Sequence, residues 1–172
     1  MFFPSAYSSF FPANPSFCRP AHHHQPENIL IDSQGYARLC DFGLAKVLRR
    51  GETTFTMCGS PEYMAPEMII GRGHGIKTDV WSFGVLIWEM LIGKTPFAKN
   101  YHEEAPPAVI LMTILKETIK YPKGTPKAAT TLMKKIFNRD AHKRMSPTAI
   151  KKHYFFGELS RDKEVGHTRL AL

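Results

Sequence analysis

The chain has 172 residues, a length that favours one domain, and its hydrophobic content of 43% is ordinary for a globular protein. Its formal net charge of +8 comes from scattered Lys and Arg without a nucleic-acid motif, so a solvated basic surface is the better interpretation and no nucleic-acid partner is expected. Three widely spaced cysteines without a C-x-x-C pair argue against a disulfide framework or a zinc ribbon and fit a reducing compartment.

The first 20 residues are rich in Phe, Ser and Pro, and four prolines break any helix there. They lack a basic start and an unbroken apolar core, so they do not resemble a signal peptide. We expect residues 1–20 to be disordered or poorly packed. No membrane segment is predicted, and a cytoplasmic location, with the nucleus as a second one, is expected.

Two short apolar runs, residues 28–32 and 36–40, are separated by three polar or small residues that include Gly35. This pattern predicts a β-hairpin, with Gly35 in the turn. Asp41-Phe42-Gly43 follows the second run directly. A polar, Thr-rich loop is then expected over residues 49–60.

Residues 80–92 are the most hydrophobic stretch, with ten apolar side chains in thirteen positions. Because they do not keep to one stripe, the pattern predicts a helix buried on all sides. We expect Thr78 or Asp79 to cap its start and Gly93 to end it in a left-handed turn. Asp79 and Glu89 are charged exceptions that need partners in a core.

Further helices are predicted from periodicity and from proline and capping signals. Ser146 is expected to cap the last of them. Phe155 and Phe156 are expected to end the packed part, with residues 157–172 as a loose tail. The expected helices span residues 65–70, 108–118, 128–137 and 147–153.

Four motifs occur in one order, with the hairpin and the Thr-rich loop between them. Together they resemble the C-terminal lobe of a eukaryotic protein kinase of the serine/threonine type, in the AGC group that includes the cyclic-nucleotide-dependent kinases. The resemblance implies a mainly α lobe of an α+β family fold, over residues 21–156, with a small β-hairpin at the nucleotide side and a central buried helix. The motifs are Pro26-Glu27-Asn28, Asp41-Phe42-Gly43, Ala65-Pro66-Glu67 and Asp79-x-Trp81-x-x-Gly84.

The resemblance implies ATP and Mg²⁺ as cofactors of the family. Asp41 would bind the magnesium that bridges the phosphates, Asn28 would hold a second ion, and Leu30 would lie under the adenine ring. Phe42 and Gly43 would be structural, with Gly43 allowing a sharp turn after Asp41. Taken singly, Asn28 could be a turn residue and Asp41 a loop acid.

Thr56 matches the activation-loop phosphosite of the group, which an upstream kinase would phosphorylate, and Lys46 matches one of its basic partners. The alternative for Thr56 is an ordinary exposed hydroxyl. Ser60 resembles the residue that, with Tyr63, shapes the substrate-binding loop.

Glu67 and Arg144 match an acid and a buried arginine that pair across the lobe and hold the substrate loop. Asp79 resembles an acid that accepts hydrogen bonds from backbone amides of the catalytic loop. Glu27 and Glu89 match acids that receive substrate arginines, so basic protein or peptide substrates are expected. For Glu27 a solvated surface role is nearly as good an interpretation.

The chain departs from the family where catalysis is concentrated. His23 stands at the catalytic Asp position, Gln25 at the catalytic Lys position, and His22 at the position of the Arg that binds the phosphorylated loop. No G-x-G-x-x-G loop or V-A-I-K strand occurs, so an N-terminal lobe is not expected, and binding of ATP and Mg²⁺ by this chain is doubtful. The change near Gln25 indicates a truncation, an alternative exon or a faulty gene model.

These features predict a member of the serine/threonine protein kinase family, present as a truncated C-terminal lobe without activity of its own. One alternative is a non-catalytic, pseudokinase-like binding module or scaffold. Another is a fragment without a stable role, because part of its core would be uncovered. Residues 22–24, three adjacent histidines, could also bind a transition metal, a weak alternative in a loose segment.

Overall fold

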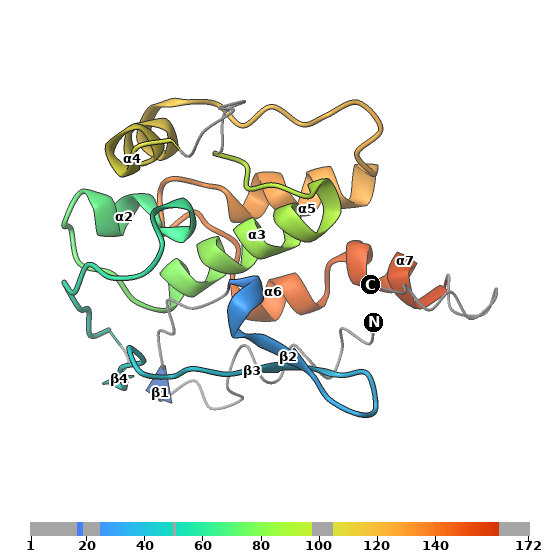
Figure 1. The fold of residues 1–172 in the computed structure, drawn as a ribbon, viewed down its shortest axis with the longest axis horizontal. Coiled ribbons are helices and arrows are strands. Elements are labelled where there is room, and N and C mark those ends of the chain that lie inside the picture. Colours follow the sequence, from blue (N-terminus) through green and yellow to red (C-terminus); the bar gives the residue numbers. More distant parts are fainter. Residues whose placement is uncertain (1–16, 19–24, 50, 98–104, 162–172) are drawn as a thin grey trace.

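The computed structural model describes residues 17–18, 25–49, 51–97 and 105–161, and Figure 1 shows their arrangement. The long helix α3 (Ile76–Ile92) runs through the middle of the molecule. Helices lie on both sides of α3, and the strands form the lower edge in this view. The predicted mainly α architecture, with a small hairpin and a central buried helix, is confirmed.

Helix α3 is buried over residues 78–88, as its uninterrupted apolar sequence predicted. Gly93 has a φ of 83°, and its N–H donates to the carbonyl of Glu89 at 2.7 Å, so the predicted left-handed end is confirmed. The predicted start is wrong. The helix begins at Ile76 after Gly75, so Thr78 and Asp79 lie in its first turn instead of capping it.

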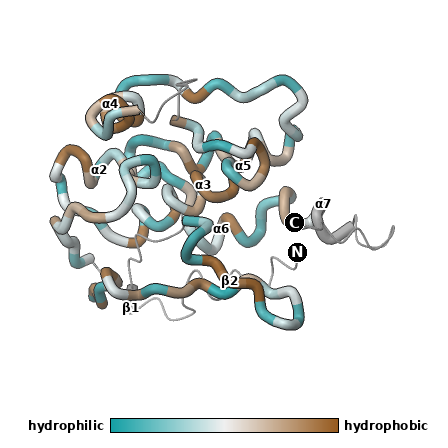
Figure 2. The backbone as a smooth tube through the Cα atoms, in the orientation of Figure 1, coloured by the Kyte–Doolittle hydropathy of each residue, from teal (hydrophilic) through white to brown (hydrophobic). Residues whose placement is uncertain are grey.

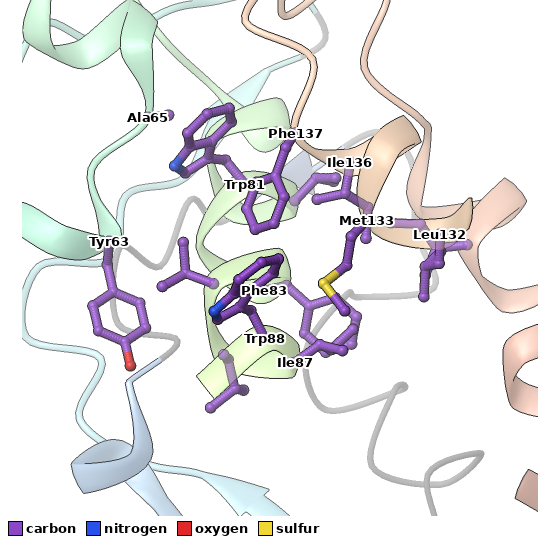
Figure 3. Close-up of a cluster of buried hydrophobic side chains, with 14 of the residues drawn as sticks. Tyr63, Ala65, Trp81, Phe83, Ile87, Trp88, Leu132, Met133, Ile136 and Phe137 are labelled. Atoms are coloured by element: carbon purple, nitrogen blue, oxygen red, sulfur yellow. The ribbon is translucent and has the colours of Figure 1, made fainter. Parts of the chain in front are cut away.

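The main core lies between α3 and α5 (Lys127–Ile136), whose inward residues Leu132, Met133 and Ile136 are fully buried. Figure 3 shows Met133 and Ile136 pointing toward the aromatic residues of α3. A Cβ built on Gly84 would lie 2.4 Å from Cγ2 of Ile136, so only glycine allows the two helices this close approach.

Aromatic rings fill the end of this core. Trp81 stacks on Phe97 with ring centroids 5.6 Å apart and meets Phe137 edge-on at 5.2 Å. Trp88 packs against Tyr121 at 5.3 Å. Offset and edge-on contacts of this kind add to the stabilisation from burial alone, so α3 is fixed along most of its length.

The hairpin consists of β2 (Ile29–Ile31) and β3 (Ala37–Leu39), which pair antiparallel with Leu30 opposite Arg38. Gly35 has a φ of 84° in the turn, as predicted. Ala37 and Leu39 point into the core, whereas Leu30 and Ile31 are exposed. The hydrophobic colour of β2 in Figure 2 therefore marks apolar surface.

A second two-stranded sheet includes two of the residues 1–20, which were expected to be disordered or poorly packed. The strand β1 (Phe17–Cys18) pairs antiparallel with β4 (Leu48–Arg49), so Phe17 and Cys18 have regular structure. The pairing joins residues about thirty positions apart, and no local pattern announces it. Residues 1–16 and 19–20 lie outside the described residues.

The remaining helices agree in part with the predictions. The short helix α2 (Pro66–Ile69) was predicted, and so was α6 (Pro147–Lys151), where Ser146 Oγ accepts the N–H of Ala149 at 3.2 Å. Helix α4 (Pro107–Lys116) ends two residues earlier than predicted. Helix α7 (Tyr154–Arg161) packs on α5 and extends into the expected loose tail, which is a correction.

Two single-turn 3₁₀ helices, η1 (Pro26–Asn28) and η2 (Pro61–Tyr63), were not predicted. Each begins with a proline, whose fixed φ suits the first position of a helix. Of the helices in the described ranges, none has the length and apolar character to cross a membrane.

Candidate functional site

The first part of the candidate site is the open end of the hairpin. The N–H of Cys40 donates to the carbonyl of Asn28 at 2.8 Å, directly before Asp41. The backbone therefore brings positions 28 and 41 to the same end of β2 and β3, as their places in the sequence predicted. Leu30 and Phe42, at 59% and 50% exposure, provide apolar surface in this region.

Asp41 adopts a left-handed conformation with a φ of 57°, which is uncommon for a residue other than glycine. Its Oδ1 accepts the N–H of Gly43 at 3.0 Å, a short-range bond that stabilises the turn. Gly43 itself lies in a turn directly after Asp41, which the N–H of Ala45 closes by donating to the carbonyl of Phe42 at 3.0 Å. Gly43 also leaves space, because a Cβ there would lie 3.1 Å from Oδ1 of Asp41.

The Thr-rich loop is held on one side by Lys46 and on the other by His74. Lys46 Nζ donates to the hydroxyl of Thr56 and, at 3.2 Å, to that of Thr54. Thr54 and His74 exchange two backbone hydrogen bonds of 2.9 Å, and His74 Nε2 lies 2.9 Å from the carbonyl of Thr56. Burial lowers the pKa of His74, which favours a neutral ring whose Nε2–H donates to that carbonyl.

A side-chain hydrogen bond between Ser60 and Gln25 links the start of η2 to the start of η1, next to the hairpin. The Ser60 hydroxyl donates to Oε1 of Gln25 at 2.7 Å, and both residues are half-buried. The resemblance described above implies a lysine of the family at the position of Gln25. The neighbouring positions 22–24, including His22 and His23, lie outside the described residues.

Tyr63 and Glu89 connect the second turn to the central helix. The Tyr63 hydroxyl donates to Oε2 of Glu89, and the tyrosine is buried while the glutamate is half-buried. Burial raises the pKa of Tyr63, and the hydrogen bond to Glu89 and the charges of Glu89, Glu27 and Glu62 raise it further. The tyrosine is therefore a permanent donor to Glu89, and the charges of two further carboxylates act on its hydroxyl.

Glu67 and Arg144 form the pair that the sequence predicted. Arg144 Nη1 and Nη2 donate to the two carboxylate oxygens of Glu67 at 2.7 and 2.8 Å. The Thr78 hydroxyl donates to the same carboxylate at 3.1 Å, and Arg144 Nε donates to the carbonyl of Asn138 at 3.1 Å. Arg144 is 2% exposed, so the pair is a buried, bidentate link between α2 and the segment before α6.

The ionisation of Glu67 follows from these contacts. Burial alone would raise the pKa of its carboxyl, but the hydrogen bonds and charge of Arg144, helped by Thr78, outweigh burial and leave the pKa lowered. The carboxylate is therefore charged at neutral pH in spite of its burial.

The remaining predicted residues have clear positions. Asp79 is 2% exposed on α3, as a core acid should be, and part of the catalytic loop expected to contact it, residues 21–24, lies outside the described residues. Glu27 is exposed in η1, which agrees with either interpretation given above.

Two contacts of this site were not predicted. The hydrogen bond between Gln25 and Ser60 was missed because Gln25 was considered only for the lysine that it replaces. His74 was missed because it stands in a glycine-rich stretch that indicated only a loop. The presence of one histidine in that stretch, residues 71–75, was the one signal that could have indicated a contact there.

Comparisons with known proteins agree with this geometry. A family model described as protein kinase domain matches residues 24–156. The chain is 40% identical over 139 residues to the cGMP-dependent protein kinase, isozyme 2 forms cD5/T2, of Drosophila melanogaster, covering 77% of the chain and 14% of that protein. It is 40% identical over 140 residues to the serine/threonine-protein kinase YPK1 of Saccharomyces cerevisiae, covering 79% and 20%.

It is also 38% identical over 144 residues to the cAMP-dependent protein kinase catalytic subunit of Dictyostelium discoideum, covering 81% of the chain and 21% of that protein. The chain thus spans about a fifth or less of the length of these curated relatives.

Proposed function

The chain belongs to the protein kinase family, with serine/threonine kinases of the AGC type among its relatives, and on this premise we propose that it forms the substrate-binding side of such a kinase and transfers no phosphate by itself. The family acts on proteins. The specific proposal is a lobe that holds basic peptide segments, and it includes the non-catalytic binding module considered from the sequence.

The observation that carries the proposal is the way in which residues 60–67, called the substrate loop below, are held in place. Three side-chain contacts fix it at separate points: Ser60 to Gln25, Tyr63 to Glu89, and Glu67 to Arg144. All three use only side chains of this chain, so the loop has a defined shape to present. The carboxylates near the Tyr63 hydroxyl would attract the guanidinium groups of a basic peptide.

The proposed lack of phosphate transfer rests on the residues at the catalytic positions. In the family a carboxylate accepts the substrate proton, and a lysine neutralises the transferred phosphate. His23 lacks the negative charge of the first group, and Gln25 lacks the positive charge of the second. These 172 residues also contain no glycine-rich phosphate loop.

The donor set at the hairpin end nevertheless suits Mg²⁺. Asn28 and Asp41 would hold the ions through amide and carboxylate oxygens, the hard ligands that magnesium prefers. In the described part of the chain no group of three His, Cys, Asp or Glu could hold a metal, so phosphate and water oxygens would supply the remaining ligands. When bound, ATP and Mg²⁺ would supply the phosphoryl group and neutralise its charge.

Thr56 is part of the proposal as a site for an upstream kinase. It is exposed, and its hydroxyl accepts a hydrogen bond from Lys46, which supports the role of this lysine as a partner of a phosphorylated loop. A phosphate there would gain a charge-assisted contact without a rearrangement of Lys46.

Peptide binding tests the proposal through Glu89→Gln. This variant keeps an acceptor for the Tyr63 hydroxyl but removes the charge, so binding of an arginine-rich peptide should weaken by roughly fivefold, or about 1 kcal/mol. Fluorescence anisotropy of a fluorescein-labelled peptide with the purified chain measures the affinity.

Glu117→Gln, which removes one negative charge at the exposed end of α4, is the matched control and should leave the affinity unchanged. If the peptide does not bind, or if both variants bind it as well as the original chain does, the proposed peptide-binding surface is wrong.

A further inference from the structure

The two 3₁₀ turns of the candidate site have the same construction. Gln25 precedes Pro26 and Glu27 in η1, and Ser60 precedes Pro61 and Glu62 in η2. In each turn the carbonyl of the first residue accepts the N–H three positions later at 3.0 Å. The side chains of these two first residues are the ones that bond to each other.

This contact joins parts of the chain that are otherwise far apart. Gln25 and Ser60 are separated by 35 positions, and their bond is a side-chain link between the segment that enters the hairpin and the substrate loop. Tyr63 ties the same loop to Glu89 of α3, and Glu67 ties it to Arg144. Without Gln25, the loop would keep its anchors at Tyr63 and Glu67 and lose the one at Ser60.

We propose that Gln25 is a positioning residue, which holds the second turn against the first through Ser60 and so keeps the peptide-binding surface formed without any nucleotide. The proposal rests on the proposed function, because it assigns a role to Gln25 in that same surface. The neutral amide oxygen of Gln25 accepts a hydrogen bond from the Ser60 hydroxyl, and this contact uses only side chains of the chain itself.

The hydrogen bond between Ser60 and Gln25 is neutral and half-buried, so it should stabilise the contact between the two turns only modestly. Its loss should therefore weaken peptide binding roughly three- to tenfold. Because Gln25 acts through Ser60, Gln25→Ala and Ser60→Ala should have effects that do not add. A residue that touched the peptide directly would give additive losses instead.

The test is a double-mutant cycle on the full chain, read by anisotropy of the labelled arginine-rich peptide without nucleotide. Gln25→Ala, Ser60→Ala and the double variant should weaken binding to a similar degree. Gln25→Glu keeps the acceptor oxygen, but its added charge would itself attract the peptide, so this variant is read by hydrogen exchange alone. Gln34→Ala, at an exposed glutamine in the hairpin turn, is the matched control and should bind as the original chain does.

Hydrogen exchange of the backbone amides of Ser60, Glu62, Tyr63 and Met64 provides the second readout, and it does not need peptide binding. Protection should fall in Gln25→Ala and return in Gln25→Glu. If the original chain binds no peptide, the proposed function fails and this exchange pattern still decides the role of Gln25. Unchanged protection in Gln25→Ala, or additive losses of peptide affinity in the cycle, would overturn the positioning role.

Discussion

Arg144→Ala is expected to lower the free energy of unfolding by about 3–5 kcal/mol, because it leaves the Glu67 carboxylate buried without its partner. The loss should exceed what the two hydrogen bonds contribute alone, since the stranded charge has little access to water. Urea unfolding followed by circular dichroism measures it.

The exposed pair formed by Lys143 and Asp140 is the control for Arg144→Ala. Their charged atoms lie 3.6 Å apart and both side chains are open to solvent, so Lys143→Ala should change the stability far less than Arg144→Ala does. Equal effects of Lys143→Ala and Arg144→Ala would mean that the link between α2 and the segment before α6 is not buried in solution.

The same pair gives the stability a dependence on pH. The pKa of Glu67 is lower in the folded chain than its ordinary value of 4.5, so the unfolded chain binds this proton more readily. The contribution of Glu67 to stability is therefore fully present above pH 4.5 and is lost as the pH falls through the lowered value. In Glu67→Gln this component of the acid sensitivity should be absent.

Gly84→Ala is expected to destabilise the fold by about 1–3 kcal/mol, because the added Cβ would lie 2.4 Å from Ile136 and 3.1 Å from the ring of Phe137. Helix propensity alone predicts the opposite sign, a gain of about 1 kcal/mol for alanine over glycine. The clash should win because α3 and α5 are both packed on their other sides. Thermal unfolding with a two-state fit gives the difference.

Gly157 provides the matched control, because it is also a helical glycine but a Cβ added to it would meet nothing within 4 Å. Gly157→Ala should leave the stability unchanged or raise it by up to about 1 kcal/mol. If Gly84→Ala also stabilised the chain, the close contact between α3 and α5 would be wrong.

Local signals were enough to predict the elements around which the fold is built. The apolar run of α3, the glycine at its end and the hairpin turn at Gly35 all depend on neighbours in the sequence, and all are confirmed. The start of α3 was predicted incorrectly, because Thr78 and Asp79 have the chemistry of caps. Their side chains are instead used inside the lobe, where Thr78 donates to Glu67.

Features that depend on distant partners could not be predicted in the same way. The strand at Phe17–Cys18 exists through its pairing with Leu48–Arg49, and the bond from Ser60 to Gln25 joins two turns that were not predicted. The left-handed conformation of Asp41 was not predicted, because glycine is the usual residue for it. The side-chain bond from Asp41 to its own loop explains the exception.

The most direct test of the account is transfer of radiolabelled phosphate from ATP with Mg²⁺ to the arginine-rich peptide by the purified chain. We expect incorporation at the level of the Asp41→Ala variant, while the peptide itself binds in the anisotropy experiment. Phosphate transfer by the original chain that disappears in Asp41→Ala would contradict the account, because the positions of His23 and Gln25 would then support catalysis.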